Sequence, residues 1–235
     1  MKTIQVYYDN PYLKTLNCRV IDYWEINTIS NIVLDKTIFY PEGGGQPCDT
    51  GMFSFGNHTI SIDHIHIIEG EIVHQSKNCV DFKTNENTNT FIDWNNRHRN
   101  MRAHSAGHLL HDTLMELYPD LVPIRGSHGK KAFLEYKGQI SPNDKENIEK
   151  AININLEKDS PIITKEIEYQ ELTNDCQFIP QNLPTNKPLR IIKIGDYKAM
   201  PDGGVHVKAT KEIGKIWIAN IINSSDSATI RYGIV

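Results

Sequence analysis

The first 92 residues alternate between apolar and polar positions in short runs. These runs are rich in Val, Ile, Tyr and Thr, and turn residues separate them at short intervals. Alternation with a period of two is typical of β-strands, and many short strands in succession predict a small barrel or sandwich. We expect strands at residues 3–8, 17–26, 31–39, 58–68, 71–75 and 90–92, and an exposed polar loop at residues 83–89.

From residue 93 onward the period changes to that of a helix. Apolar residues recur at three- and four-residue steps, which predicts a helix at residues 95–117 with a buried stripe. The stripe consists of Ala103, Ala106, Leu110, Leu114 and Leu117. Asp93 is placed to cap the start of this helix, and Pro119 to stop it.

The remainder of the chain mixes strands with a second helix. We expect a loop at residues 121–131 and strands at residues 132–136, 162–169, 189–194, 205–209, 215–222 and 229–234. Ser141 and Pro142 form a helix start, and Ile148, Ala151, Ile152 and Leu156 would give that helix its core face. The predicted fold class is α+β. A β-barrel-like domain (residues 1–92) precedes an α+β metal-binding domain (residues 93–235) with helices on a mainly antiparallel sheet.

Two clusters of candidate metal ligands stand far apart in the sequence. His104 and His108 lie four residues apart, so their rings share one face of the predicted helix and can converge on one ion. Asp202 and His206 are also four apart, and Gly203 and Gly204 between them permit a tight turn. Paired histidines often arise by chance, but two imidazoles together with a carboxylate and a third imidazole form a plausible zinc set.

A glycine-rich loop interrupts the β-rich half. Gly43, Gly44 and Gly45 are consecutive, and Gln46 and Asp49 follow them. Three glycines in a row carry a large entropic cost, so such a loop usually turns through unusual dihedrals or lets something approach its backbone closely. A hairpin connection without a function explains the composition equally well.

Composition and charge limit the classes of protein to consider. A net charge of −4 and a pI near 6.2 argue against electrostatic coating of nucleic acid, although not against gripping one end of an RNA. Basic residues crowd the start of the helix (Arg97, His98, Arg99 and Arg102) and lie near the second ligand cluster (Lys208, Lys211 and Lys215). They are candidate phosphate contacts, or simply a solvated face. The four cysteines are scattered, and neither a signal peptide nor a membrane-length apolar run is present. We therefore expect a cytoplasmic protein with free thiols.

The motifs resemble those of alanyl-tRNA editing proteins. The segment Met101-Arg102-Ala103-His104-Ser105-Ala106-Gly107-His108-Leu109-Leu110 resembles the HxxxH motif of that family. The segment Asp202-Gly203-Gly204-Val205-His206-Val207-Lys208 resembles its Cys-x-x-x-His motif, and the glycine loop resembles that of the longer, freestanding AlaX proteins. The three motifs occur in the family's order and cover nearly the whole chain.

The resemblance implies an ATP-independent deacylase with one zinc ion that releases a wrongly attached amino acid, most often serine, from the tRNA for alanine. Metal ligation would fall to His104, His108, Asp202 and His206, and catalytic roles to His104, His108, Gly44 and Gln46. Contacts to the substrate or to the tRNA acceptor end would come from Gly43, Gly44, Gly45, Arg102, Ile124, Arg125 and Val205.

Two positions depart from the family motif. Asp202 stands in place of the ligating cysteine and Val205 in place of a threonine. A carboxylate is a harder donor than a thiolate, so divalent ions other than zinc become possible. Two alternatives therefore stay open: a metal-dependent hydrolase of small esters or amides, and a non-catalytic tRNA-binding module that a metal stabilises.

Overall fold

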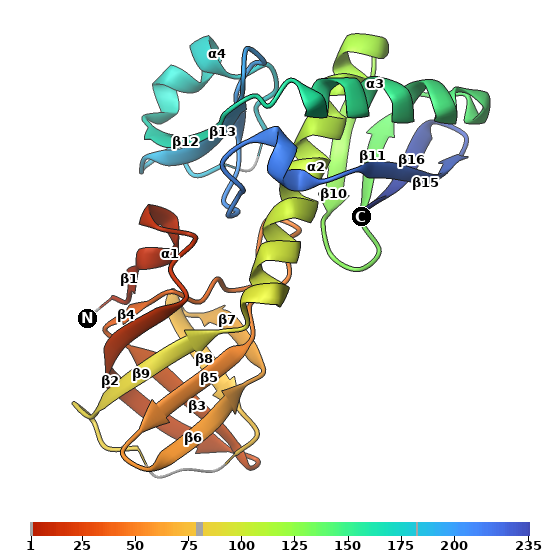
Figure 1. Cartoon of the computed structure of the whole chain (residues 1–235). Helices are drawn as coiled ribbons and strands as arrows, with labels where there is room; N and C mark the ends of the chain where they lie inside the picture. The colour runs from red at the N-terminus through yellow and green to blue at the C-terminus, as the bar shows by residue number, and fades with distance from the viewer. Residues whose placement is uncertain (1, 79–81, 182) are drawn as a thin grey trace. The chain divides into compact units, whose positions relative to one another are not determined.

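The computed structural model describes residues 2–78, 82–181 and 183–235 (Figure 1). It separates into two compact units, one formed by Met1–Gly43 and Pro47–Arg99 and the other by Gly44–Gln46 and Asn100–Val235. The division falls inside helix α2 (Trp94–Leu117), and the tip of the glycine loop groups with the second unit. The α+β class with mostly antiparallel sheets is confirmed, whereas a boundary between separately folding domains after residue 92 stays a prediction.

The first unit contains a seven-stranded antiparallel sheet. Its strands follow the order β6 (His58–Ile62), β5 (Gly51–Phe55), β9 (Asn87–Ile92), β2 (Thr15–Ile26), β3 (Ile29–Leu34), β8 (Glu71–Ser76) and β7 (His64–Ile68). Strand β2 pairs with β9 through its first half and with β3 through its second half. Asp63 alone separates β6 from β7, the two edge strands. These shared strands make the sheet curl, as Figure 1 shows, which is compatible with the predicted barrel.

Several local predictions for this unit need correction. Residues 3–8 form only the short strand β1 (Ile4–Gln5), which pairs in parallel with β4 (Lys36–Thr37), followed by the one-turn helix α1 (Val6–Asp9). Tyr7 lies in that turn and is buried, so tertiary packing overrides its strand propensity. Strand β5 was not predicted, because it is a short run between glycines. Strand β9 begins at Asn87, inside the predicted polar loop, and buries every second side chain.

Arg97 is neither a phosphate contact nor part of a solvated face, the two alternatives that the sequence left open. Its side chain is fully buried and forms an ion pair with Asp49, and its Nε lies 2.9 Å from Oδ1. Its remaining N–H groups donate to the carbonyl oxygens of Pro11 and Ile38. A charge without solvent needs such partners, because burying it unpaired is very costly. Arg97 therefore stabilises the interior of the first unit.

The second unit contains two sheets and a long packed helix. The four-stranded sheet has the order β10 (Val122–Ser127), β11 (Phe133–Lys137), β16 (Ser227–Ile234) and β15 (Ile216–Asn223), and helix α3 (Lys145–Glu157) packs on β15. The three-stranded sheet has the order β12 (Ile162–Ile167), β13 (Leu189–Ile194) and β14 (Met200–Pro201). Short helical turns complete the unit: η1 (Pro142–Asp144), η2 (Tyr169–Glu171), α4 (Leu172–Asp175) and η3 (Thr210–Ile213).

Most helix and strand predictions for this unit are confirmed. Ser141 Oγ accepts from the backbone N–H of Asn143, and at the start of α2, which still belongs to the first unit, Asp93 Oδ1 accepts from that of Asn96. The apolar stripe of α2 is buried except for Leu117, which is 45% exposed at the end of the helix. Among the described residues, no helix is long and apolar enough to span a membrane.

Two predictions for the second unit are wrong. Residues 121–131 are not all loop, because they include β10, whose alternation Pro123 and Gly126 obscure. Residues 205–209 do not form a strand. The backbone N–H of Val205 donates to Gln46 Oε1 and that of Val207 donates to Ser105 Oγ. Side chains distant in sequence therefore take the hydrogen bonds that a neighbouring strand would supply.

Candidate metal centre and adjoining cavity

The second unit brings the two predicted ligand clusters together. His104 and His108 lie on one face of α2 with ring centroids 4.9 Å apart, and both are buried. Asp202 Oδ1 lies 3.3 Å from Nε2 of His104 and 3.5 Å from Nε2 of His108, and Asp202 Oδ2 lies 2.8 Å from Nε2 of His206. One ligand atom from each of these residues lies within 4.8 Å of all the others, so the four side chains could hold one metal ion.

Hydrogen bonds to the far ring nitrogens orient the imidazoles. Nδ1 of His104 lies 2.8 Å from Oε1 of Gln46, an atom that only accepts, so Nδ1 carries the proton and Nε2 keeps its lone pair. Nδ1 of His206 lies 3.2 Å from Oγ of Ser105. Nδ1 of His108 lies 2.7 Å from the thioether sulfur of Met200. The Gln46 carbonyl oxygen thus fixes the tautomer of His104 and aims its Nε2 at a metal, while Ser105 and Met200 hold the other two rings in place.

The charges and the unpaired atoms of the cluster suit a cation. Burial lowers the pKa of His108, and lowers that of His206 to about 3, so both imidazoles are neutral near pH 7. Burial by itself would raise the pKa of Asp202, but the neighbouring imidazoles outweigh it and hold that pKa well below its usual range. Nε2 of His104 and Nε2 of His108 are buried without a hydrogen-bond partner. Three imidazole nitrogens and one carboxylate are a donor set that zinc accepts.

Glycines permit the close contacts around this cluster. A Cβ atom on Gly204 would collide with the ring of His104. In the glycine loop, Gly44 and Gly45 have positive φ angles of 57° and 76°, which other residues rarely adopt. A Cβ atom on Gly45 would also lie 2.8 Å from the carbonyl oxygen of Gly126. The loop tip therefore packs tightly against protein, and in doing so delivers Gln46 to His104.

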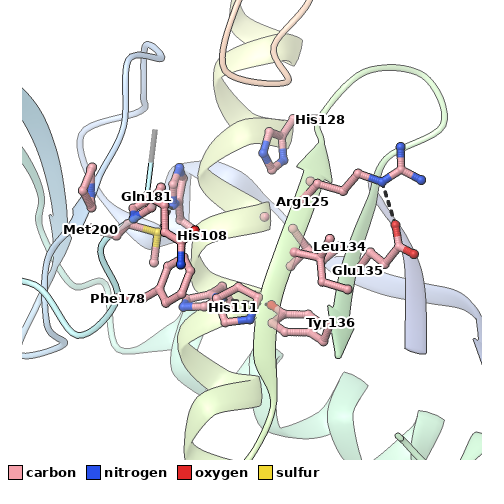
Figure 2. Close-up of a pocket in the computed structure, with 16 residues that line it drawn as sticks. His108, His111, Arg125, His128, Leu134, Glu135, Tyr136, Phe178, Gln181 and Met200 are labelled. Carbon is pink, nitrogen blue, oxygen red and sulfur yellow. Dashed lines mark hydrogen bonds and ion pairs between the residues drawn. The ribbon is translucent and has the colours of Figure 1, made fainter. Parts of the chain in front are cut away.

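A cavity of about 420 Å³ opens beside the metal cluster (Figure 2). His108 and Met200 line it next to the cluster, and His111, Tyr136 and Phe178 line it further along. Pro123, Ile124, Leu134, Pro180 and Pro201 add apolar lining, and Arg125, His128, Glu135 and Gln181 add polar lining. The cavity therefore offers a mainly apolar site with a few polar groups, as is typical of pockets for small molecules or for one end of a larger one.

Comparison with known proteins shows which family the chain belongs to. Residues 17–96 match the family model described as tRNA synthetases class II (A). The alanyl-tRNA editing protein AlaX-M of Saccharolobus solfataricus is 32% identical over 233 residues, which cover 94% of both chains. The chain belongs to the AlaX family of alanyl-tRNA editing proteins.

Longer proteins share the same region. The alanyl-tRNA editing protein AlaX-L of Pyrococcus horikoshii is 32% identical over 94% of this AlaX chain and 55% of its own length. The alanine–tRNA ligase of Pyrococcus abyssi is 29% identical over 92% of this chain and 24% of its own length. The present chain therefore spans about half the length of AlaX-L and about a quarter of that ligase.

The structure of this AlaX chain places the remaining candidate residues in different surroundings. Ile124 and Arg125 line the cavity, and Arg125 Nε donates to Glu135 Oε2 over 2.6 Å. Val205 is buried and holds Gln46 through its backbone N–H. Arg102 donates to the carbonyl oxygens of Ile213 and Val235, so its guanidinium is already engaged.

Sequence reasoning missed three residues that lie next to the cluster. Ser105 and Met200 contact ligand histidines, and the ring of His128 stacks on that of His104 with centroids 4.1 Å apart. Ser105 lies between the two motif histidines, so its position was a usable signal. Met200 and His128 carry no local pattern, because chain folding alone brings them to the site. Of the four cysteines, Cys18, Cys48 and Cys176 are free, and Cys79 lies outside the described residues.

Proposed function

We propose that this chain is a trans-editing hydrolase that removes serine from mischarged tRNA for alanine with the help of one zinc ion. The observation that carries the proposal is the buried convergence of His104, His108, Asp202 and His206, with two imidazole nitrogens left unpaired. The membership of this chain in the AlaX family supports the same activity, because relatives of similar sequence are named alanyl-tRNA editing proteins. An aminoacyl ester is already activated, so holding and orienting it could supply much of the rate.

The four metal ligands and Gln46 would have different tasks at the site. His104, His108, Asp202 and His206 would hold the zinc, which when bound supplies a Lewis acid that polarises oxygen or acidifies water. Gln46 fixes the ring of His104 through its Oε1, while its Nε2 is buried without a hydrogen-bond partner. A buried unpaired N–H₂ group costs free energy until a ligand satisfies it. Gln46 does not line the cavity, so we assign it a supporting role in catalysis, in which it orients the ring of His104.

The cavity would receive the aminoacylated acceptor end of the tRNA. Ile124 and Arg125 lie on its wall, and the backbone of Gly43, Gly44 and Gly45 and the side chains of Arg102 and Val205 remain proposed contacts or supports for that end. Exclusion of water by the apolar lining would strengthen the polar contacts at the reacting centre. We also propose that residues 1–92 form a barrel-like domain, that residues 93–235 form a metal-binding domain, and that the protein is cytoplasmic.

Single-turnover deacylation with seryl-tRNA for alanine tests the proposal. Zinc-loaded wild type should release serine and leave the alanyl ester largely intact. His108→Ala should lose both the metal and the activity, whereas the matched control His58→Ala, an exposed histidine of the first unit, should keep both. If the wild type leaves every mischarged tRNA intact but cleaves a simple amino-acid ester with bound metal, the small-ester hydrolase replaces this proposal. Protection of tRNA without turnover would instead favour a binding module.

A further inference from the structure

His128 is a buried histidine beside the metal cluster that is not one of its ligands. It directly follows strand β10, and its ring stacks on that of His104. It is 6% exposed, and it lines the same cavity as His108 (Figure 2). The four-residue ligand cluster does not include it. Its position therefore calls for a role other than metal binding.

The hydrogen bonds of His128 determine which of its nitrogens can accept. Tyr232 Oη donates its single proton to the carbonyl oxygen of Ala103 over 3.0 Å. The same Oη lies 2.7 Å from Nδ1 of His128, so Nδ1 must donate, and in the neutral ring Nε2 then carries a bare lone pair. Nε2 has no hydrogen-bond partner among the described residues, and it is not sealed from solvent as Nε2 of His104 and of His108 are. The site therefore presents one neutral acceptor to the cavity.

The surrounding backbone is shaped to hold this arrangement. A Cβ atom on Gly107 would collide with Nδ1 of His128 and would lie 2.6 Å from Oη of Tyr232. The backbone N–H of His128 donates to the carbonyl oxygen of Gly45 over 2.8 Å. Helix α2, the glycine-loop tip and the C-terminal strand β16, which carries Tyr232, thus all position one ring. Such support is typical of a residue whose orientation matters for binding.

The chemistry of the acceptor indicates what it binds. A neutral imidazole acceptor suits a neutral hydroxyl donor, and Glu135, the carboxylate in the cavity lining, is already paired with Arg125. We propose that His128 is a specificity-determining residue that accepts a hydrogen bond from the side-chain hydroxyl of the aminoacyl group, so that serine is bound and alanine is not. The inference rests on the proposed editing function. A site built to bond a hydroxyl leaves a polar group unpaired when the hydroxyl is missing, and this penalty discriminates strongly.

Rates on three esters of the same tRNA test this inference. Zinc-loaded wild type, His128→Leu, His128→Gln and Tyr232→Phe are compared on seryl-, alanyl- and glycyl-tRNA for alanine, with metal content measured on each sample. In His128→Leu the ratio of the seryl to the glycyl rate should fall about tenfold to a hundredfold, because the hydroxyl loses its acceptor. His128→Gln, which keeps an acceptor oxygen, should recover part of that ratio. Tyr232→Phe frees the ring to change tautomer, and the ratio should fall to an intermediate value.

Equal losses on seryl and glycyl esters would overturn the inference, because His128 would then act on a group common to all esters. A His128→Leu variant that keeps the wild-type ratio of seryl to glycyl rates, or whose rates return fully on adding zinc, would overturn the inference as well. Calorimetry with non-hydrolysable 3′-seryl- and 3′-alanyl-amino-adenosine separates this question from the proposed activity. If the wild type shows no turnover but binds the seryl analogue more tightly, and His128→Leu loses that preference, the role of His128 stands while the editing proposal fails. Equal binding of both analogues by the wild type would contradict the role of His128.

Discussion

Replacing Gln46 with leucine should weaken metal binding without removing a ligand. Oε1 of Gln46 accepts two N–H groups, from His104 Nδ1 at 2.8 Å and from Val205 N at 3.1 Å, and the side chain is only 1% exposed. Leucine has a similar volume but no acceptor. Both donors would then be buried without partners, and the ring of His104 would lose the contact that fixes its tautomer.

The magnitude follows from these two bonds. Loss of a partner to a ligating histidine typically lowers metal affinity about 10- to 100-fold, or about 1.4–2.7 kcal/mol. The stranded N–H of Val205 should cost the metal-free protein a further 1–3 kcal/mol or so of unfolding free energy. The two effects are separable, because the first concerns the bound metal and the second is present without it.

Two measurements check the prediction. Competition against a chromophoric chelator gives the zinc affinity, and urea unfolding of chelator-treated protein gives the stability. Gln46→Glu is the matched control, since it keeps an acceptor oxygen and should bind zinc more tightly than Gln46→Leu. A Gln46→Leu variant that binds zinc within about twofold of wild type would refute the tautomer-fixing role, given the roughly tenfold minimum expected for such a partner.

Three further predictions concern individual side chains. Asp202→Ala should lower zinc affinity while Asp202→Cys holds zinc at least as well, and full occupancy of the alanine variant under mild chelation would show that Asp202 is not a ligand. Arg97→Ala should destabilise the protein by about 3–5 kcal/mol in urea unfolding, since it leaves a buried carboxylate unpaired, and Arg97→Met with Asp49→Leu should restore most of that loss. His74 is buried, and its Nε2 accepts a hydrogen bond from Thr37 Oγ1. Burial lowers the pKa of His74 to about 4. As the pH falls, the unfolded chain, in which His74 has its ordinary pKa near 6.5, binds a proton before the folded chain does. The free energy of unfolding should therefore fall by roughly 3 kcal/mol as the pH drops from 6.5 to 4. In urea midpoints measured across that range, His74→Gln should show a smaller loss.

Local pattern was sufficient for much of the fold and for the metal ligands. The helical period placed α2 within one residue of its observed start, and the spacing of His104 and His108 required their rings to share one face. Alternation located β13 with its observed bounds. Local pattern failed where distant groups compete for the backbone, as in residues 205–209, where Gln46 and Ser105 take the N–H groups of Val205 and Val207.

The sequence by itself therefore determined most of the helices and strands and which residue types can bind a metal, because these depend on spacing along one helix, strand or turn. The tertiary structure alone decided which atoms become available. Arg97 and Arg102 look alike in sequence, yet one is buried against Asp49 and the other holds carbonyl groups of the C-terminal segment. His128 is unremarkable in sequence, and only its bond to Tyr232 leaves Nε2 as an acceptor. Burial, tautomer and pKa depend on neighbours that are distant in the chain, and no local pattern records them.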